Sequence, residues 1–129
     1  MTAGILSSIH TPADVHALSA QQLRDLCFEI RTTLLDYGRK HGGHIGSNLG
    51  VVELTVALHR VFNSPRDRFI FDVSHQSYVH KMLTGRAEAY LDESRFGEVT
   101  GFTNPLESEH DSFVPVSYTH LRAHETPEH

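Results

Sequence analysis

One predicted helix, from Leu49 to Phe62, is apolar on nearly all of its sides, and this limits the folds open to the chain. Valine, leucine and alanine occupy not just one stripe of this segment but most of the helix circumference. Such a helix is stable in water only when other elements cover most of its surface. We therefore expect it to lie inside an α/β layer.

A second predicted helix precedes it. Ser19 can cap its first turn while Gln22 reaches back to the backbone of the cap, which is the capping-box pattern. The helix should end near Tyr37 or Gly38. Apolar residues at helical spacing give it one buried stripe, and Cys27 lies on that stripe, where a small buried core residue is expected. The stripe contains Leu23, Leu26, Cys27, Ile30 and Leu34.

The segment after the apolar helix indicates a parallel strand. Asn63 to Asp67 is a cluster of turn formers, and Phe69 to Val73 is a short apolar run typical of a buried parallel strand. Gln76 to Tyr90 should be helical with a break near Thr84-Gly85, and Gly97 to Phe113 should be irregular. The fold class predicted from these elements is α/β.

Composition excludes several classes of protein. The 129 residues are 39% hydrophobic, enough for one modest core. The formal charge is −5 with mixed signs, so no basic stripe is available for nucleic acid. No run of 18 apolar residues and no signal peptide is found. We expect a cytoplasmic protein with no nucleic-acid or membrane partner.

Two histidines lie where a ligand could reach them. His75 follows the predicted strand, and ligands of open α/β sheets bind beyond the carboxyl ends of strands. Imidazole there can donate to a phosphate oxygen or move a proton near neutral pH; alternatively, His75 and Gln76 cap the next helix or satisfy loop carbonyls. His44 lies in a glycine-rich loop, Gly42 to Asn48, that matches neither the Walker nor the dinucleotide pattern.

A zinc site is the competing explanation for eleven histidines. His41 and His44 are three residues apart, and His75 and His80 are five apart. With a single cysteine and no His-Glu-x-x-His motif, local spacing gives no complete four-ligand set. We expect no metal site built from this chain alone.

Three segments carry a resemblance to a known family. Residues Gly42 to His59 resemble the opening motif of 1-deoxy-D-xylulose-5-phosphate synthases, and Phe71 to Arg86 resemble their Asp-Val-Gly-His-Gln-x-Tyr-x-His-Lys segment. Gly101 to Thr103 with Glu107 to Phe113 is similar to the stretch before the next cofactor loop. The resemblance covers roughly Leu6 to Phe113.

The resemblance implies a cofactor and two site residues. Members of the family bind thiamine diphosphate through Mg²⁺, and the cofactor carries out the carbon chemistry. By this likeness His75 contacts the cofactor, and His44 is catalytic, assisting proton transfer or holding substrate oxygens. His80 and Lys81 are supports behind them. The Mg²⁺ ligands and the glutamate that activates the cofactor are expected in a missing C-terminal part.

The implied fold is a truncated part of a three-layer, parallel-sheet thiamine-diphosphate-binding domain. The implied reaction condenses pyruvate with glyceraldehyde 3-phosphate to 1-deoxy-D-xylulose 5-phosphate, a precursor of isoprenoids and thiamine, in an enzyme that is a homodimer when full length. One alternative is transketolase-like two-carbon transfer. Another is that the isolated chain is a non-catalytic remnant.

Two departures from the family pattern are visible. Ser74 replaces the glycine before the motif histidine, which suggests a divergent branch. After Phe113 the family's Gly-His-x-Ser-Thr-Ser is missing, so we expect residues 1–113 to form part of the cofactor-binding domain and 114–129 to be an unrelated tail, from a frameshift or joined DNA. An exposed sheet edge and uncovered apolar helices predict poor solubility.

Overall fold

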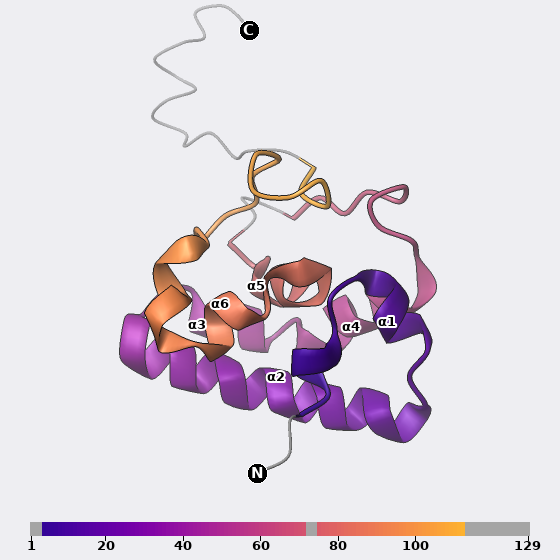
Figure 1. Ribbon diagram of the computed structural model, residues 1–129, viewed down its shortest axis with the longest axis horizontal. Coiled ribbons are helices and arrows are strands. Elements are labelled where there is room, and N and C mark those ends of the chain that lie inside the picture. The colour runs from indigo at the N-terminus through magenta and orange to yellow at the C-terminus, as the bar shows by residue number, and fades with distance from the viewer. Residues whose placement is uncertain (1–3, 72–74, 113–129) are drawn as a thin grey trace, which may run out of the picture.

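The computed structural model describes residues 4–71 and 75–112, and within these ranges the chain is helical, without a strand. Figure 1 shows the long helix α2 along one side of the molecule, with several of the shorter helices packed against it. None of the described helices is long and apolar enough to cross a membrane. The elements are η1 (Leu6–Ser8), α1 (Pro12–His16), α2 (Ala20–His41), α3 (Ile45–Leu49), α4 (Val52–Val61), α5 (Tyr78–Lys81), the π-helical η2 (Met82–Arg86), α6 (Glu88–Leu91) and η3 (Glu93–Glu98).

Helix α2 begins as the capping box predicted. The Ser19 hydroxyl accepts a hydrogen bond from the Gln22 backbone at 3.2 Å, and the Gln22 side chain accepts from the Ser19 backbone at 2.9 Å. The helix continues to His41, a few residues beyond the predicted end, and stops where Gly42 takes a φ of 91°. The predicted apolar stripe is buried at Leu26, Ile30, Leu34 and Tyr37.

The predicted apolar helix from Leu49 to Phe62 forms in part, as α4, and α3 precedes it. Helix α4 buries only one stripe, of which Val52 and Val56 are members. On its other side Leu54 is 59% exposed and Val61 is 66% exposed. The expectation that this helix is covered on most sides was therefore wrong for the described residues, because no second layer packs on that face.

The predicted strand is not confirmed in the residues that the structure describes. Residues 69–71 have no regular structure, and 72–73 lie outside the described residues. A strand exists only when its backbone N–H and C=O groups pair with a neighbouring strand, and no neighbouring strand occurs in the described part. The α/β sheet expected from the sequence is not present in residues 4–71 and 75–112.

The segment after residue 75 follows the prediction closely. It is helical, with the expected break: Thr84 and Gly85 leave helical geometry, and Gly85 takes a φ of 101°. Beyond η3 the chain is irregular to residue 112, also as expected. The core lies between α2 and this segment, where Val79, Met82 and Leu83 are fully buried.

Candidate functional site

His44 is placed by a glycine turn between α2 and α3. Gly43 has a φ of 110°, and a Cβ atom there would lie 2.6 Å from the Tyr78 hydroxyl. The same hydroxyl accepts a hydrogen bond from the His44 backbone N–H at 3.1 Å. Gly43 is required both by its backbone conformation and by this close approach, so the glycine-rich sequence fixes where His44 enters α3.

The structure brings His44 and His75 together. Their ring centroids are 5.3 Å apart, although the residues come from different segments. The Phe102 ring lies 5.5 Å from the His44 ring, and a Cβ atom on Gly101 would be 3.5 Å from His44 Cδ2. All three motif segments therefore meet at one place.

The two imidazoles are available to a ligand. His44 is exposed and His75 is half-buried. Within the described residues, no ring nitrogen of either histidine makes a hydrogen bond to the protein; His75 is held through its backbone carbonyl and His44 through its backbone N–H and carbonyl. Free ring nitrogens at this separation can donate to or accept from one bound polyanion or reacting group.

Behind these histidines lies a buried amide. Asn48 is fully buried, and its Nδ2 donates to the His44 carbonyl at 2.6 Å and to the His75 carbonyl at 2.8 Å. Its Oδ1 accepts from the Tyr78 backbone N–H at 2.9 Å. Sequence reasoning missed Asn48 as a site residue; the available signal was a polar residue one helical turn after His44, and Asn48 is the buried residue of α3.

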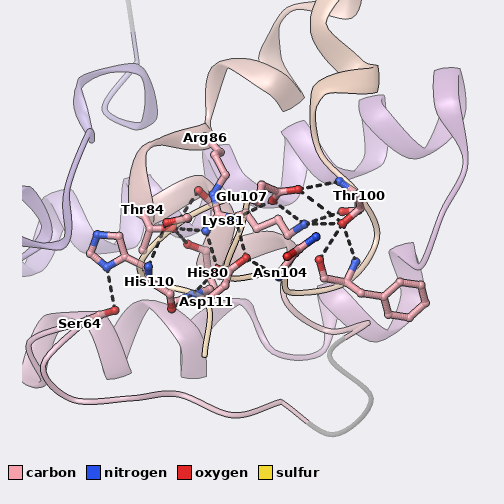
Figure 2. Close-up of polar contacts among 12 residues, drawn as sticks. Ser64, His80, Lys81, Thr84, Arg86, Thr100, Asn104, Glu107, His110 and Asp111 are labelled. Atoms are coloured by element: carbon pink, nitrogen blue, oxygen red, sulfur yellow. Dashed lines mark hydrogen bonds and ion pairs between the residues drawn. The ribbon is translucent and has the colours of Figure 1, made fainter. Parts of the chain in front are cut away.

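A second cluster joins the helices to the loop after Thr100. We call it the ion network, and its charged members are Lys81, Arg86, Glu107 and Asp111. Figure 2 shows its members and their contacts. Arg86 forms ion pairs with Glu107 at 2.6 Å and with Asp111 at 2.8 Å, and Lys81 forms one with Glu107 at 2.8 Å. The Lys81 side chain is fully buried, and its Nζ also donates to the Thr100 carbonyl at 2.7 Å.

The pKa shifts in the ion network follow from burial and pairing. Burial lowers the pKa of Lys81, and the hydrogen bond with Glu107 opposes this shift. At Asp111 burial acts to raise the pKa, but hydrogen bonds from Arg86 and His80 outweigh it and hold the pKa well below its usual value. Each buried charged side chain of the network thus faces a group of opposite sign.

Two stacked histidines extend the ion network into the core. The Nε2 atom of His80 faces two acceptors, the His110 carbonyl at 2.9 Å and Asp111 Oδ1 at 3.2 Å, so it carries a proton. With a proton on His80 Nε2, the Nδ1 atom of His80 accepts from the Nε2–H of His59, 2.8 Å away. Burial and the neighbouring His80 lower the pKa of His59 to about 3, so His59 is neutral at pH 7.

The structure separates residues that the sequence had grouped. His80 and Lys81, expected as supports behind the site, lie in the ion network, and within the described residues neither side chain makes a hydrogen bond or ion pair with His44 or His75. Arg86, Glu107 and Asp111 were missed as its partners, although their opposite charges in two motif segments were a usable signal. Ser74 lies outside the described residues.

Two further features concern Cys27 and possible metal ligands. Cys27 is half-buried against the core, and burial raises the pKa of its thiol. In the part of the chain that the structure describes, no group of three His, Cys, Asp or Glu side chains is arranged to hold a metal ion.

Comparison with known proteins agrees with the motif geometry. The family model described as 1-deoxy-D-xylulose-5-phosphate synthase matches residues 6–121. The chain belongs to this family. The 1-deoxy-D-xylulose-5-phosphate synthase of Chlamydia trachomatis serovar L2 is 56% identical over 114 residues, which are 88% of this chain and 18% of that protein. Those of Corynebacterium glutamicum strain R and Acidobacterium capsulatum are 57% and 54% identical, over 84% of this chain and 17% of each protein.

The chain thus spans only 17–18% of the length of these synthase relatives. The matched region contains all three motif segments, including both site histidines and the ion network. The predicted boundary between residues 113 and 114 lies outside the described residues and stays a prediction.

Proposed function

We propose that this chain supplies the His44 and His75 portion of the active site of an enzyme that condenses pyruvate with glyceraldehyde 3-phosphate, releasing CO₂ and forming 1-deoxy-D-xylulose 5-phosphate. The observation that carries the proposal is the meeting of the two motif histidines, 5.3 Å apart between ring centroids, with ring nitrogens that make no hydrogen bond to residues 4–71 or 75–112. Family membership supports the choice of reaction.

The residues present fit thiamine diphosphate as cofactor. When bound, thiamine diphosphate stabilises the carbanion that the reaction requires. His75, half-buried a few residues before α5, would donate a hydrogen bond to the cofactor. His44, exposed beside it, would hold a substrate oxygen or move a proton at its free ring nitrogen. Mg²⁺ ligands would come from the remainder of a full-length protein.

The finer fold belongs to the same proposal. In a full-length protein, residues 69–73 would become one strand of a parallel sheet in a three-layer domain, with the remaining strands supplied by later sequence. The exposed Ile70 and the uncovered face of α4 would then be buried. We further propose a homodimer in the cytoplasm, and an isolated chain without turnover of its own.

A chimeric enzyme tests the proposal. Residues 6–113 of this chain would replace the matching segment of the Chlamydia trachomatis relative, and product would be assayed with pyruvate and glyceraldehyde 3-phosphate. We expect His44→Ala to lower kcat roughly 10²- to 10⁴-fold, the range for a proton-transfer group. His75→Ala should weaken thiamine diphosphate binding roughly 10-fold or more, measured by titration.

The matched control is His10→Ala, which removes an exposed imidazole away from the site and should leave both quantities unchanged. Full activity in a chimera that lacks both site histidines would overturn the roles assigned to them. Turnover only with a ketose phosphate in place of pyruvate would overturn the reaction and support two-carbon transfer. Micromolar binding of thiamine diphosphate by the 129-residue chain would contradict its being inert alone.

A further inference from the structure

The Asn48 side chain connects three separate backbone groups. Its two amide hydrogens go to different carbonyls, those of His44 and His75, at 2.6 and 2.8 Å. Its carbonyl oxygen takes the N–H of Tyr78 at 2.9 Å. Because the side chain is fully buried, water cannot replace any of these partners.

The two backbone carbonyls that accept from Asn48 are those of the two site histidines. His75 is 27 positions from Asn48 along the chain, so no local turn holds it near His44. His44 is the N-terminal cap residue of helix α3. Tyr78, whose N–H donates to Asn48, is the first residue of helix α5. One amide therefore sets the distance between the segments that present the two rings.

Ordinary helix capping does not account for this arrangement. A side chain that serves only its own helix bonds within the same turn, as the Asn48 contact with the His44 carbonyl does. The contacts with the His75 carbonyl and the Tyr78 N–H reach a different segment. Truncating the side chain would take these partners from the His75 carbonyl and the Tyr78 N–H, whereas the His44 carbonyl would keep the Asn48 backbone N–H and the Ser47 hydroxyl as donors, each at 3.3 Å.

We propose that Asn48 is a positioning residue of the active site, whose side-chain amide fixes the separation of His44 and His75 without touching the ligand. This inference rests on the proposed function of the two histidines. A misplacement of a catalytic group by about 1 Å costs on the order of 100-fold in rate. Loss of the amide should therefore act mainly on kcat.

The 129-residue chain itself gives a direct test by NMR. The Asn48 side-chain amide protons should exchange slowly with water and show through-hydrogen-bond couplings to the carbonyl carbons of both His44 and His75. Nuclear Overhauser contacts should join the His44 and His75 rings. Fast exchange, or coupling to only one carbonyl, would overturn the proposal without any substitution.

Asn48→Asp is the informative variant, because it keeps the size of the side chain and the acceptor for Tyr78. At alkaline pH a carboxylate would face two carbonyl oxygens and donate to neither. Burial beside these oxygens raises a carboxyl pKa, so acidification restores one donor. In the chimeric enzyme we expect kcat about 10- to 100-fold below the parent at pH 8, with a markedly smaller deficit near pH 6.

The control is Asn63→Asp, the same exchange at an exposed asparagine, whose activity relative to the parent should be flat with pH. A merely structural role of Asn48 would also give a flat ratio, with a lowered melting temperature, and would overturn the proposal. If Asn48→Asp does not fold, the couplings in the unsubstituted chain decide alone.

The outcomes separate this inference from the function beneath it. If His44→Ala and His75→Ala are harmless in the chimera, the proposed function fails. If those substitutions lower activity while Asn48→Asp does not, only the positioning role fails.

Discussion

Arg86 shows how a single residue can hold an irregular loop to a helical core. Its guanidinium contacts the carboxylates of Glu107 and Asp111, both from the loop after Thr100, and the Thr84 hydroxyl. Planar bidentate pairing with Asp111 fixes direction as well as distance. Since the segment from 99 to 112 has no regular structure of its own, these contacts decide where Gly101 and Phe102 lie beside His44.

Removing the Asp111 carboxylate should therefore be costly. Asp111→Asn leaves part of a buried guanidinium unpaired, and we expect the free energy of unfolding to fall by about 3 kcal/mol at pH 7, measured by urea denaturation. Because the folded pKa of Asp111 is depressed, its contribution is complete above its unfolded pKa and is lost as the pH falls further. The difference between parent and variant should shrink below about pH 4.

Asp25→Asn, at an exposed position on α2, is the matched control and should change the free energy of unfolding by less than about 0.5 kcal/mol. An Asp111→Asn variant as stable as this control would contradict the role given to the ion network.

His59 should make the protein sensitive to mild acid. Its pKa falls from 6.5 to about 3 on folding, so between these values the unfolded chain binds the proton and the folded chain does not. Stability is full above pH 6.5 and should be lost on the order of 1 kcal/mol per pH unit below it. His59→Gln keeps a donor for His80 but cannot titrate, so denaturation curves should show a weaker acid dependence.

The comparison for this titration is His10→Gln, which alters an exposed histidine and should keep the acid dependence of the parent. Identical pH slopes for His59→Gln and the parent would show that His59 does not account for the effect.

At the scale of elements, the turn between α2 and α3 is sensitive to side-chain size at Gly43. Gly43→Ala adds a methyl group at a φ of 110°, with the Tyr78 hydroxyl 2.6 Å from its position. We expect a loss of about 1–3 kcal/mol in the free energy of unfolding, and a changed environment of the His44 ring by NMR.

Gly46→Ala makes the same change three residues later, inside α3, where no atom lies within 4 Å of the added carbon. Alanine favours the helix by about 1 kcal/mol, so this variant should be as stable as the parent or more so. Equal losses in the two variants would refute the argument from Gly43.

Elements that depend on local contacts were predictable, and those that need distant partners were not. The Ser19 capping box and the break at Gly85 are encoded within a few residues, and both form. The strand from Phe69 to Val73 requires a neighbouring strand, which no local pattern can supply. Likewise, the sequence marked His44 and His75 by their motifs, whereas the bridging role of Asn48 depends on segments that meet only in the fold.

At the scale of the whole molecule, one face remains uncovered. A groove of about 330 Å³ lies between α4 and the irregular segment after Asp67. Ile70, on its rim, is 72% exposed, and Leu54 is 59% exposed. Apolar surface of this kind drives association in water. The groove is lined by Val51, Leu54, Thr55, Leu58, Phe69, Ile70, Phe71 and Gln76.

We therefore expect the 129-residue chain to self-associate through this groove. The double variant Leu54→Lys with Ile70→Lys should remain monomeric at concentrations where the parent associates, as measured by sedimentation velocity, with little change in melting temperature. Leu106→Lys, at an exposed turn away from the groove, is the control. A monomeric parent, or equal rescue by the control, would contradict this expectation.

The contacts of Asn48 have a consequence for how this site can be altered. The Asn48 amide donates to the backbone carbonyls at positions 44 and 75, and these hydrogen bonds do not involve the side chains there. Any amino acid that keeps the backbone conformation would be presented from the same two points. The side chains at positions 44 and 75 can thus be exchanged, by evolution or by design, to give the site a new chemistry while Asn48 keeps the backbone of both positions in place.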